Sequence, residues 1–304
     1  MKKILIAGIG GIGGFFGGKL ADHYTGTDTE IYFLSRGENF KEILRHGLKV
    51  YYENQHFVAH PRKISNNAAD FGIVDLLICC TKSYHLEETL QQLRPCINTE
   101  TVILPLQNGV DSFERTKALF PENEIWKGCV YIVSRLVKPG KVVDTGHLRR
   151  LFFGTSEALS GKLIEAEKLF RSAGIDTHLS SDIEKTIWEK FSFISPLASA
   201  TSYLDETVGQ ILENPQSTLL LRMLMEEFLS VAEAKGILLA ADSIEKSLQR
   251  MATLSFDTTS SMHSDLRSGN KIEVESLVAY ILNEAVAHKL DCPAYRKVYE
   301  KLKS

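Results

Sequence analysis

The first 180 residues alternate short hydrophobic runs with segments of helical pattern. The runs at 4–7 and 76–80 are continuously apolar, as expected for parallel strands that are covered on both faces. The expected strands are Lys3–Ile9, Glu30–Leu34, Leu48–Tyr52, Val74–Cys80, Thr101–Leu106, Ile125–Leu136, Lys141–Asp144 and Leu151–Gly154. Because strands that alternate with helices form right-handed βαβ units, this half is predicted to be an α/β, Rossmann-type doubly wound sheet. The Pro-Gly pair within Val137–Lys141 predicts a turn that closes an antiparallel hairpin.

Beyond residue 182 the hydrophobic pattern becomes helical. Apolar residues recur three and four positions apart in four segments: Ile183–Tyr203, Ser217–Gly236, Asp242–Leu254 and Ile272–Leu290. In the last segment one stripe is expected to be buried, made up of Val274, Leu277, Val278, Ile281, Ala285 and Val286. We therefore expect a Rossmann domain over residues 1–180, followed by an all-helical domain over residues 181–304.

Composition removes several classes of protein. The chain has 304 residues, of which 44% are hydrophobic and 24% charged, and a net charge of -3, so the basic surface that binds nucleic acid is not expected. The five cysteines contain no CxxC pair and the nine histidines no helical metal-binding pair, so no disulfide framework and no metal site are predicted. The apolar run after Lys2 and Lys3 imitates a signal peptide, but it holds seven glycines, which are poor helix formers. With no segment that suits a membrane span, we expect a cytoplasmic protein.

Glycines follow the first expected strand in the pattern GxGxxG, from Gly8 to Gly13. The pattern alone is weak, but here it lies between an apolar strand and an expected helix over Phe15–Tyr24, as in dinucleotide-binding proteins. In that role Gly8 allows a tight turn, Gly10 lets the backbone approach a pyrophosphate, and Gly13 lets the helix pack closely on its strand. The N–H groups at the start of the helix then face the phosphates. A flexible loop without a ligand is the alternative.

An overlapping GxxxxGK pattern ends at Lys19. The next residue is Leu20, where a P-loop needs a Ser or Thr hydroxyl to hold Mg²⁺. The pattern also begins well after the strand, so Lys19 is expected to lie inside the helix, and a nucleoside triphosphatase is not predicted.

Two basic residues bear on the choice of dinucleotide. Arg36 follows the second strand, where an acidic residue would bind the ribose of NAD and an arginine accommodates the 2′-phosphate of NADP. Nearby Glu38 keeps NAD as an alternative, and Arg36 could also be an ordinary surface residue, but the signature favours NADP. Lys82 is expected to open a helix, where the helix dipole disfavours a cation. A cofactor phosphate beside Lys82 would explain it, and so would simple exposure to solvent.

Three further segments complete a resemblance to the ketopantoate reductase (2-dehydropantoate 2-reductase) family. They are Leu104-Pro105-Leu106-Gln107-Asn108-Gly109-Val110, Ile187-Trp188-Glu189-Lys190, and Ser260-Ser261-Met262 through Glu273. Their order and spacing are more specific than any one of them, and the resemblance covers nearly the whole chain. It implies that NADPH binds the Rossmann domain, that the helical domain supplies substrate-binding and catalytic groups, and that a small 2-keto acid lies in the cleft between them.

The resemblance also implies roles for four side chains. Hydride would pass from the nicotinamide to the keto carbon while Lys190 protonates the developing alkoxide, and its charge would stabilise that alkoxide. Glu273 matches the acceptor for the substrate hydroxyl, and Ser261 matches a contact to the substrate carboxylate. Asn108 matches the loop beneath the nicotinamide and the substrate.

Each of these residues also has a purely structural explanation. A lysine on an amphipathic helix usually faces solvent, although Lys190 precedes an apolar run. Asn270 and Glu273 have the spacing of a capping box, with Asn270 as the N-cap. Ser261 could be a helix N-cap, and an Asn-Gly pair by default marks a turn.

The chain departs from the family pattern at three positions after the lysine. The family usually carries asparagines that line the substrate cleft, and an ungapped count puts apolar residues there: Ile194, Ala198 and Val208. This change should remove hydrogen bonds to the substrate or the lysine, so a bulkier or less polar 2-keto acid would suit the chain better. Three nearby serines could compensate: Ser195, Ser199 and Ser202.

The best prediction is therefore the NADPH-dependent reduction of a 2-keto acid, with ketopantoate to pantoate, in pantothenate and coenzyme A synthesis, as the specific reaction. The alternatives are a different 2-keto acid, a silent NADP-binding sensor or regulator, and a related dehydrogenase that oxidises a β-hydroxy acid. The sequence leaves the oligomeric state open, with a homodimer among the options.

Overall fold

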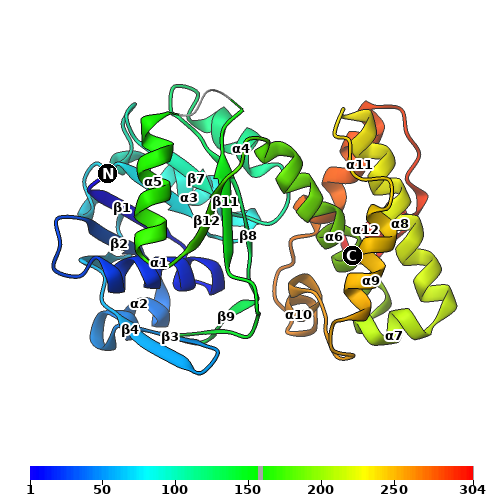
Figure 1. Cartoon of the computed structure of the whole chain (residues 1–304), viewed down its shortest axis with the longest axis horizontal. Coiled ribbons are helices and arrows are strands. Elements are labelled where there is room, and N and C mark those ends of the chain that lie inside the picture. Colours follow the sequence, from blue (N-terminus) through cyan, green and yellow to red (C-terminus); the bar gives the residue numbers. More distant parts are fainter. Residues whose placement is uncertain (157–159, 304) are drawn as a thin grey trace. The chain divides into compact units, whose positions relative to one another are not determined.

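The chain folds as two compact units in the computed structural model, which describes residues 1–156 and 160–303 (Figure 1). The first unit comprises Met1–Gln107 and Ser112–Glu184, and the second comprises Asn108–Asp111 and Lys185–Ser304. The second unit thus includes a short segment that the expected boundary at residue 180 assigns to the Rossmann domain.

A five-stranded parallel sheet forms the centre of the first unit. Its strand order is β5-β2-β1-β6-β7, with bounds β1 Lys3–Ala7, β2 Glu30–Leu34, β5 Lys63–Ser65, β6 Leu76–Cys79 and β7 Val102–Pro105. Ile4 pairs with Ile31 on one side and with Leu76 on the other. The predicted doubly wound, Rossmann-type sheet is confirmed, and its order reverses at β1.

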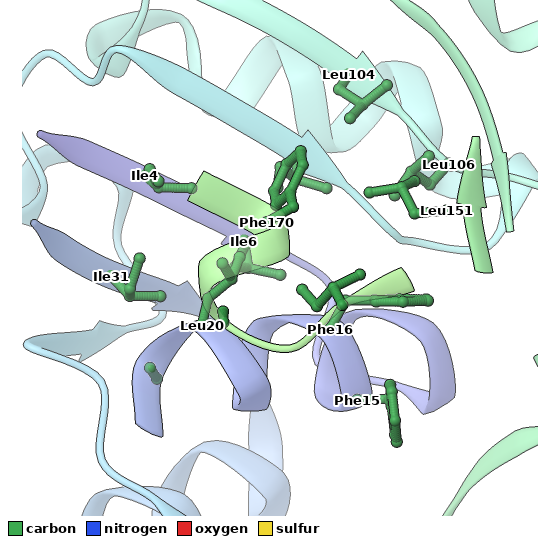
Figure 2. Close-up of a cluster of buried hydrophobic side chains, with 14 of the residues drawn as sticks. Ile4, Ile6, Phe15, Phe16, Leu20, Ile31, Leu104, Leu106, Leu151 and Phe170 are labelled. Carbon is green, nitrogen blue, oxygen red and sulfur yellow. The ribbon is translucent and has the colours of Figure 1, made fainter. Parts of the chain in front are cut away.

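Helices cover both faces of this sheet. The helices of the first unit are α1 Gly11–His23, α2 Gly37–His46, α3 Leu86–Gln92, α4 Ser112–Leu119 and α5 Gly161–Ser172, with 3-10 turns η1 Ala68–Asp70, η2 Ser83–His85 and η3 Arg94–Cys96. Ile4 and Ile6 of β1 pack with Phe15, Phe16 and Leu20 of α1, and Phe170 of α5 joins the same cluster (Figure 2). The alternate residues of β1, Leu5 and Ala7, pack with α3 on the other face. Burial on both faces explains why this strand is apolar without interruption.

Two smaller sheets complete the first unit. One has the order β4-β3-β10-β9, formed by β3 Leu48–Tyr52, β4 Gln55–Ala59, β9 Ser134–Lys138 and β10 Lys141–Asp144. The other has the order β12-β11-β8, formed by β8 Lys127–Tyr131, β11 Arg150–Gly154 and β12 Asp176–Leu179. The predicted strand Ile125–Leu136 is therefore wrong as a single element, because its two halves belong to different sheets. The predicted hairpin is confirmed: β9 and β10 are antiparallel, and Lys138 pairs with Lys141.

The elements of the second unit are helical, as the pattern predicts. They are α6 Ile183–Leu204, α7 Val208–Glu213, α8 Pro215–Ala234, α9 Ser243–Ala252, α10 Ser261–Arg267, the π-helix η4 Glu275–Ala279, α11 Tyr280–Ala287 and α12 Pro293–Lys303, and the first two residues of α6 lie in the first unit. Phe191 of α6 lies 5.2 Å from Phe228 of α8, measured between ring centroids, and Trp188 lies 5.6 Å from the same ring. These aromatic contacts fix the face of α6 that is turned into the core.

The predicted buried stripe over 274–286 is wrong at its end. Val274 through Ala285 follow the prediction, but the side chain of Val286 is 78% exposed. The π-helical turn at Glu275–Ala279 changes the helix phase, so later residues do not keep the three- and four-residue spacing of an α-helix.

Candidate functional site

The candidate site of the first unit is the glycine loop after β1. Gly8 has φ +91, in the left-handed region, and a Cβ placed on it would lie 2.8 Å from the backbone nitrogen of Thr81. A Cβ on Gly13 would collide with the carbonyl oxygen of Gly8, whereas a Cβ on Gly10 would meet no atom within 4 Å. The loop therefore has the tight turn, the close helix–strand contact and the open backbone position that the sequence predicted for Gly8, Gly13 and Gly10.

Helix α1 begins directly at this loop. Its N-cap residue is Gly10, which has no side chain to bond the first amides, and its first turn contains no acidic residue. The first N–H groups of a helix lack intrahelical partners and attract anions. The arrangement fits a dinucleotide pyrophosphate, and the overlapping P-loop pattern fails as expected, because Lys19 lies inside α1 and donates to the Tyr52 hydroxyl at 3.1 Å.

Arg36 and Lys82 follow the two strands that flank β1. Because β2, β1 and β6 are parallel, their carboxyl ends lie at one edge of the sheet, together with the glycine loop. Arg36 is the N-cap of α2, its side chain is 47% exposed, and it donates to Gln92 Oε1 of α3. The carboxylate of Glu38, the residue that keeps NAD as an alternative, lies 2.7 Å from Lys41 in an ion pair. Hydrogen bonding by Lys41 lowers the pKa of Glu38.

The prediction that a helix begins at Lys82 is wrong. Lys82 precedes a short 3-10 turn, Ser83–His85, and α3 begins only at Leu86. The dipole argument for an anion at Lys82 therefore has no basis, since the residue lies outside the first turn of α3. Gln107, which has no predicted role, bonds the end of β6 and the residues just before Lys82: its Nε2 donates to the carbonyl oxygens of Cys79 at 3.1 Å and Thr81 at 3.2 Å.

The second unit has a candidate site of its own around Lys190. This residue is only 9% exposed, and its Nζ donates to Oδ1 of Asn108 at 2.9 Å. The expectation that a helical lysine faces solvent is wrong here. Burial of an ammonium group is costly unless a partner stabilises it, and the Asn108 amide oxygen is such a partner.

Asn108 is held by the segment that crosses into the second unit. Gly109 has φ +103, which favours glycine, and Asp111 Oδ2 accepts a hydrogen bond from the Ser276 hydroxyl at 3.3 Å. The Asn-Gly pair lies in a bend of the chain, and Asn108 is bonded to Lys190. Glu273 lies three residues before Ser276 and is 4% exposed, so a buried carboxyl group is close in sequence to the residue that anchors this segment.

The capping box predicted for Asn270 and Glu273 is wrong. Asn270 donates its N–H to the carbonyl oxygen of Asp265 at 2.9 Å, and Gly269 has φ +68, so both residues end α10. The next helix starts at Val274, and the N–H of Leu277 bonds the carbonyl oxygen of Glu273 at 3.0 Å. Glu273 is therefore at the beginning of that helix and not in its first turn.

Ser261 is not a helix N-cap. The N-cap of α10 is Ser260, whose hydroxyl accepts the N–H of His263 at 3.0 Å, and Ser261 is the exposed first residue of the helix. The cap hydrogen bond is made by the Ser260 hydroxyl and does not involve the Ser261 hydroxyl. The explanation of Ser261 as an N-cap therefore does not hold.

The three serines near the positions of the family asparagines differ in their place on α6: Ser202 continues the row of Lys190 one turn after Ala198, and Ser195 and Ser199 lie off that row. Lys190, Ile194 and Ala198 recur every four residues of α6 and share one face. Ser195 and Ser199 form a different row of α6 and are fully buried. The Ser195 hydroxyl bonds the carbonyl oxygen of Leu277 at 2.6 Å and the Tyr295 hydroxyl at 2.7 Å. The row of α6 that contains Lys190 is therefore apolar at Ile194 and Ala198 and polar again at the buried Ser202.

The cysteines behave as small hydrophobic residues. All five are free thiols, and four are buried: Cys79, Cys96, Cys129 and Cys292. Burial raises the pKa of Cys96 and Cys292 to about 11, so these thiols stay protonated at neutral pH. Within residues 1–156 and 160–303, no three His, Cys, Asp or Glu side chains are grouped as ligands for a metal ion. None of the described helices is long and apolar enough to cross a membrane.

Comparison with known families matches most of the chain. Residues 4–158 match the family described as "Ketopantoate reductase PanE/ApbA", and residues 182–304 match "Ketopantoate reductase PanE/ApbA C terminal". Among curated proteins, the chain is 29% identical to the "Uncharacterized oxidoreductase YkpB" of Bacillus subtilis, covering 99% of this chain and 97% of that protein. It is 24% identical to a 2-dehydropantoate 2-reductase of Halobacterium salinarum, covering 97% and 95%.

Solved structures have the same fold over the whole length. A 2-dehydropantoate 2-reductase of Porphyromonas gingivalis W83 is 32% identical, with a TM-score of 0.86 and coverage of 100% of this chain and 99% of that one. A 2-dehydropantoate 2-reductase of Geobacter metallireducens is 26% identical, with a TM-score of 0.90 and coverage of 99% of both chains.

Proposed function

Because the chain belongs to the ketopantoate reductase family of NAD(P)-dependent oxidoreductases, we propose that it uses NADPH to reduce a 2-keto acid, and that ketopantoate is the substrate. The observation that carries the proposal is the buried Lys190, whose Nζ is hydrogen-bonded to Asn108 at 2.9 Å. A lysine held in place away from solvent is suited to give a proton to an oxygen atom that becomes negative.

In this reaction the cofactor supplies a hydride to the keto carbon. Gly8, Gly10 and Gly13 would hold its pyrophosphate at the start of α1, where the first backbone amides are available to phosphate oxygens. Lys190 stabilises the charge that develops on the substrate oxygen and donates the proton that completes the hydroxyl group. Asn108 keeps the Lys190 ammonium in one orientation, so little reorganisation is needed when that charge appears.

The substrate is held at its two polar ends. Glu273 accepts a hydrogen bond from the hydroxyl group, and its burial strengthens that bond. Ser261 bonds the carboxylate, which fits its exposed position at the start of α10. These roles come from the family pattern, and the burial of Glu273 and the exposure of Ser261 support them.

The preference for NADP rests on Arg36. Its guanidinium follows β2, at the edge of the sheet where an adenosine ribose is bound in this fold, and it suits a 2′-phosphate. Glu38 is already paired with Lys41, which makes it a weaker acceptor for ribose hydroxyls. Lys82 follows the other neighbour of β1 and contributes a second positive charge at the same edge.

A different 2-keto acid is the second candidate substrate. It is favoured by the apolar residues Ile194 and Ala198, which follow Lys190 on the same row of α6. A substrate with an apolar group on the keto carbon would lose fewer hydrogen bonds there than one with additional hydroxyls. A silent NADP-binding sensor has no comparable support, because a sensor has no need for a buried lysine.

The test is NADPH oxidation with ketopantoate and with a panel of aliphatic and aromatic 2-keto acids, comparing the wild type with Lys190→Ala. We expect turnover that falls by about 10²–10⁴-fold in the variant, as for loss of a general acid, while NADPH still binds. Lys190→Arg is the matched control, since it keeps the charge but is a far weaker proton donor. Saturable NADPH binding without turnover of any keto acid would contradict the proposal, and a clear preference for another keto acid would replace ketopantoate.

A further inference from the structure

Helix α10 carries a buried histidine that has no part in the proposed reaction. His263 is 0% exposed, and its Nε2 lies 2.8 Å from Oδ1 of Asp205. Its other ring nitrogen, Nδ1, is hydrogen-bonded to the hydroxyl group of Thr259. Any rotation of the ring would leave a buried polar atom without its partner, which is costly, so the ring is fixed on both sides.

Asp205 is the residue that ends α6. It follows the helix directly and has φ +57, the left-handed conformation that commonly terminates helices. Besides His263 it binds Arg267, whose Nε donates to Oδ1 at 2.7 Å and whose Nη2 donates to the carbonyl oxygen at 3.0 Å. Hydrogen bonds from His263 and Arg267 lower the pKa of Asp205, so the carboxylate is ionised at neutral pH and His263 Nε2 is the donor.

A second link joins the same two helices one turn earlier. The Thr201 hydroxyl of α6 donates to the carbonyl oxygen of Leu197 at 2.8 Å, so it can accept from the Ser260 hydroxyl, which lies 2.8 Å away. Ser260 is the N-cap of α10 and also accepts the N–H of His263 at 3.0 Å. The start of α10 is thus tied to α6 through both the cap and the histidine.

These links connect two groups of the proposed reaction. Lys190 lies on α6 about three helical turns before Thr201. Ser261 is the residue after the N-cap Ser260, at the start of α10. The distance between the lysine and the serine therefore depends on how firmly α10 is held at the end of α6.

We propose that His263 and Asp205 are positioning residues that fix Ser261 relative to the Lys190 face of α6, and thereby set the affinity for the carboxylate of the 2-keto acid. The inference rests on the proposed function, which assigns that carboxylate to Ser261. His263 touches no reacting atom in this role, because it acts through the first turn of α10.

Two substitutions of the histidine separate its two hydrogen bonds. In His263→Asn the amide reaches the position of Nδ1, so the Thr259 contact is kept and the link to Asp205 is lost. In His263→Gln the amide reaches the position of Nε2 and keeps the link to Asp205. We expect His263→Asn to raise KM for the keto acid by about 10–100-fold, as a displacement near 1 Å does, with a much smaller change in kcat. His263→Gln should restore most of the loss.

Asp205→Gly removes the carboxylate without straining the backbone, because glycine accepts the left-handed conformation. It should raise KM at least as much as His263→Asn does, because it also removes the acceptor of Arg267 Nε. The double variant should be no worse than Asp205→Gly alone, since both substitutions remove the contact between His263 and Asp205. Arg222→Gln is the matched control: it breaks the ion pair of Arg222 with Glu245, 2.7 Å long, between α8 and α9 in the same unit, and should leave KM unchanged.

The readouts distinguish this inference from the proposed function. Wild-type turnover with an unchanged KM in His263→Asn and Asp205→Gly would overturn the positioning role and leave the reaction standing. A fall in kcat that merely follows the amount of folded protein, measured by circular dichroism on the same samples, would also overturn it. No turnover by the wild type with any 2-keto acid would overturn the proposed function itself, and the inference with it.

Discussion

A methyl group added at Gly13 or at Gly10 would meet very different surroundings. At Gly13 it would collide with the Gly8 carbonyl oxygen, which cannot move without opening the turn, whereas at Gly10 it would find open space. We expect Gly13→Ala to lower the free energy of unfolding by roughly 1–3 kcal/mol, the usual cost of overpacking. Gly10→Ala should fold normally but bind NADPH more weakly by about tenfold or more, equivalent to about 1.4 kcal/mol, because the methyl group occupies the approach of the pyrophosphate.

Urea unfolding and a fluorescence titration with NADPH measure the two effects separately. Gly161→Ala is the control, since its added carbon also meets no atom and it opens α5, far along the chain from the loop. A Gly10→Ala protein that binds NADPH as tightly as the wild type would remove Gly10 from the site.

At the same scale, the sequence pattern could not describe the surroundings of the candidate site residues. Spacing alone predicts that Lys190 is on a helix, but a helical pattern cannot tell that this lysine is buried, because its partner Asn108 is far away in the chain. The structural explanations for Glu273 and Ser261 failed for local reasons. The backbone of Asn270 is used to end α10, and Ser260 takes the cap.

At the scale of elements, apolar strands were predicted closely and polar ones were missed. The bounds of β2, β3 and β10 agree with the sequence pattern, because each strand is rich in β-branched and aromatic residues. The polar strands β4, Gln-His-Phe-Val-Ala, and β12, Asp-Thr-His-Leu, lie at the ends of their sheets. An edge strand forms because a neighbouring strand pairs with it. That neighbour cannot be recognised from the residues of the edge strand alone.

The start of α12 depends on a carboxylate from another helix. Glu227 of α8 accepts the N–H of Ala294 at 2.8 Å with Oε1 and the N–H of Tyr295 at 3.0 Å with Oε2. We expect Glu227→Ala to lower the free energy of unfolding by about 1–2 kcal/mol, the cost of losing a helix cap. The exposed neighbour Glu226 provides the control, since Glu226→Ala should change stability by no more than about 0.5 kcal/mol in the same urea experiment. Equal effects of the two substitutions would rule out the cap.

At the scale of the whole molecule, each unit contains one of the two tryptophans, Trp126 in the first and Trp188 in the second, and both are buried. Each unit also holds a tyrosine whose pKa is raised by burial: Tyr32, to about 12, and Tyr295, further still. In the unfolded chain tyrosine ionises near pH 10. The contribution of each buried hydroxyl to the free energy of unfolding is therefore fully present below about pH 10. Above that pH it falls, by up to about 1.4 kcal/mol per pH unit.

Single-tryptophan proteins can assign this loss to a unit. In urea unfolding between pH 8 and 11, Tyr295→Phe should flatten the pH dependence reported by Trp188, and Tyr32→Phe that reported by Trp126. Each substitution serves as the control for the other. If either one flattened both curves equally, the two units would not unfold as separate cooperative bodies.

The segment Asn108–Asp111 has a consequence for how such a chain can be recombined. The polypeptide enters the second unit for four residues, returns to the first, and leaves it again at Lys185. A chimera that joins the first part of one homologue to the second part of another at the end of β12 would inherit Asn108 from one parent and Lys190 from the other. The unit that must be exchanged as a whole is therefore discontinuous: Lys190 and the four-residue segment that bonds it must come from the same parent, although more than seventy residues of the other unit separate them in the gene.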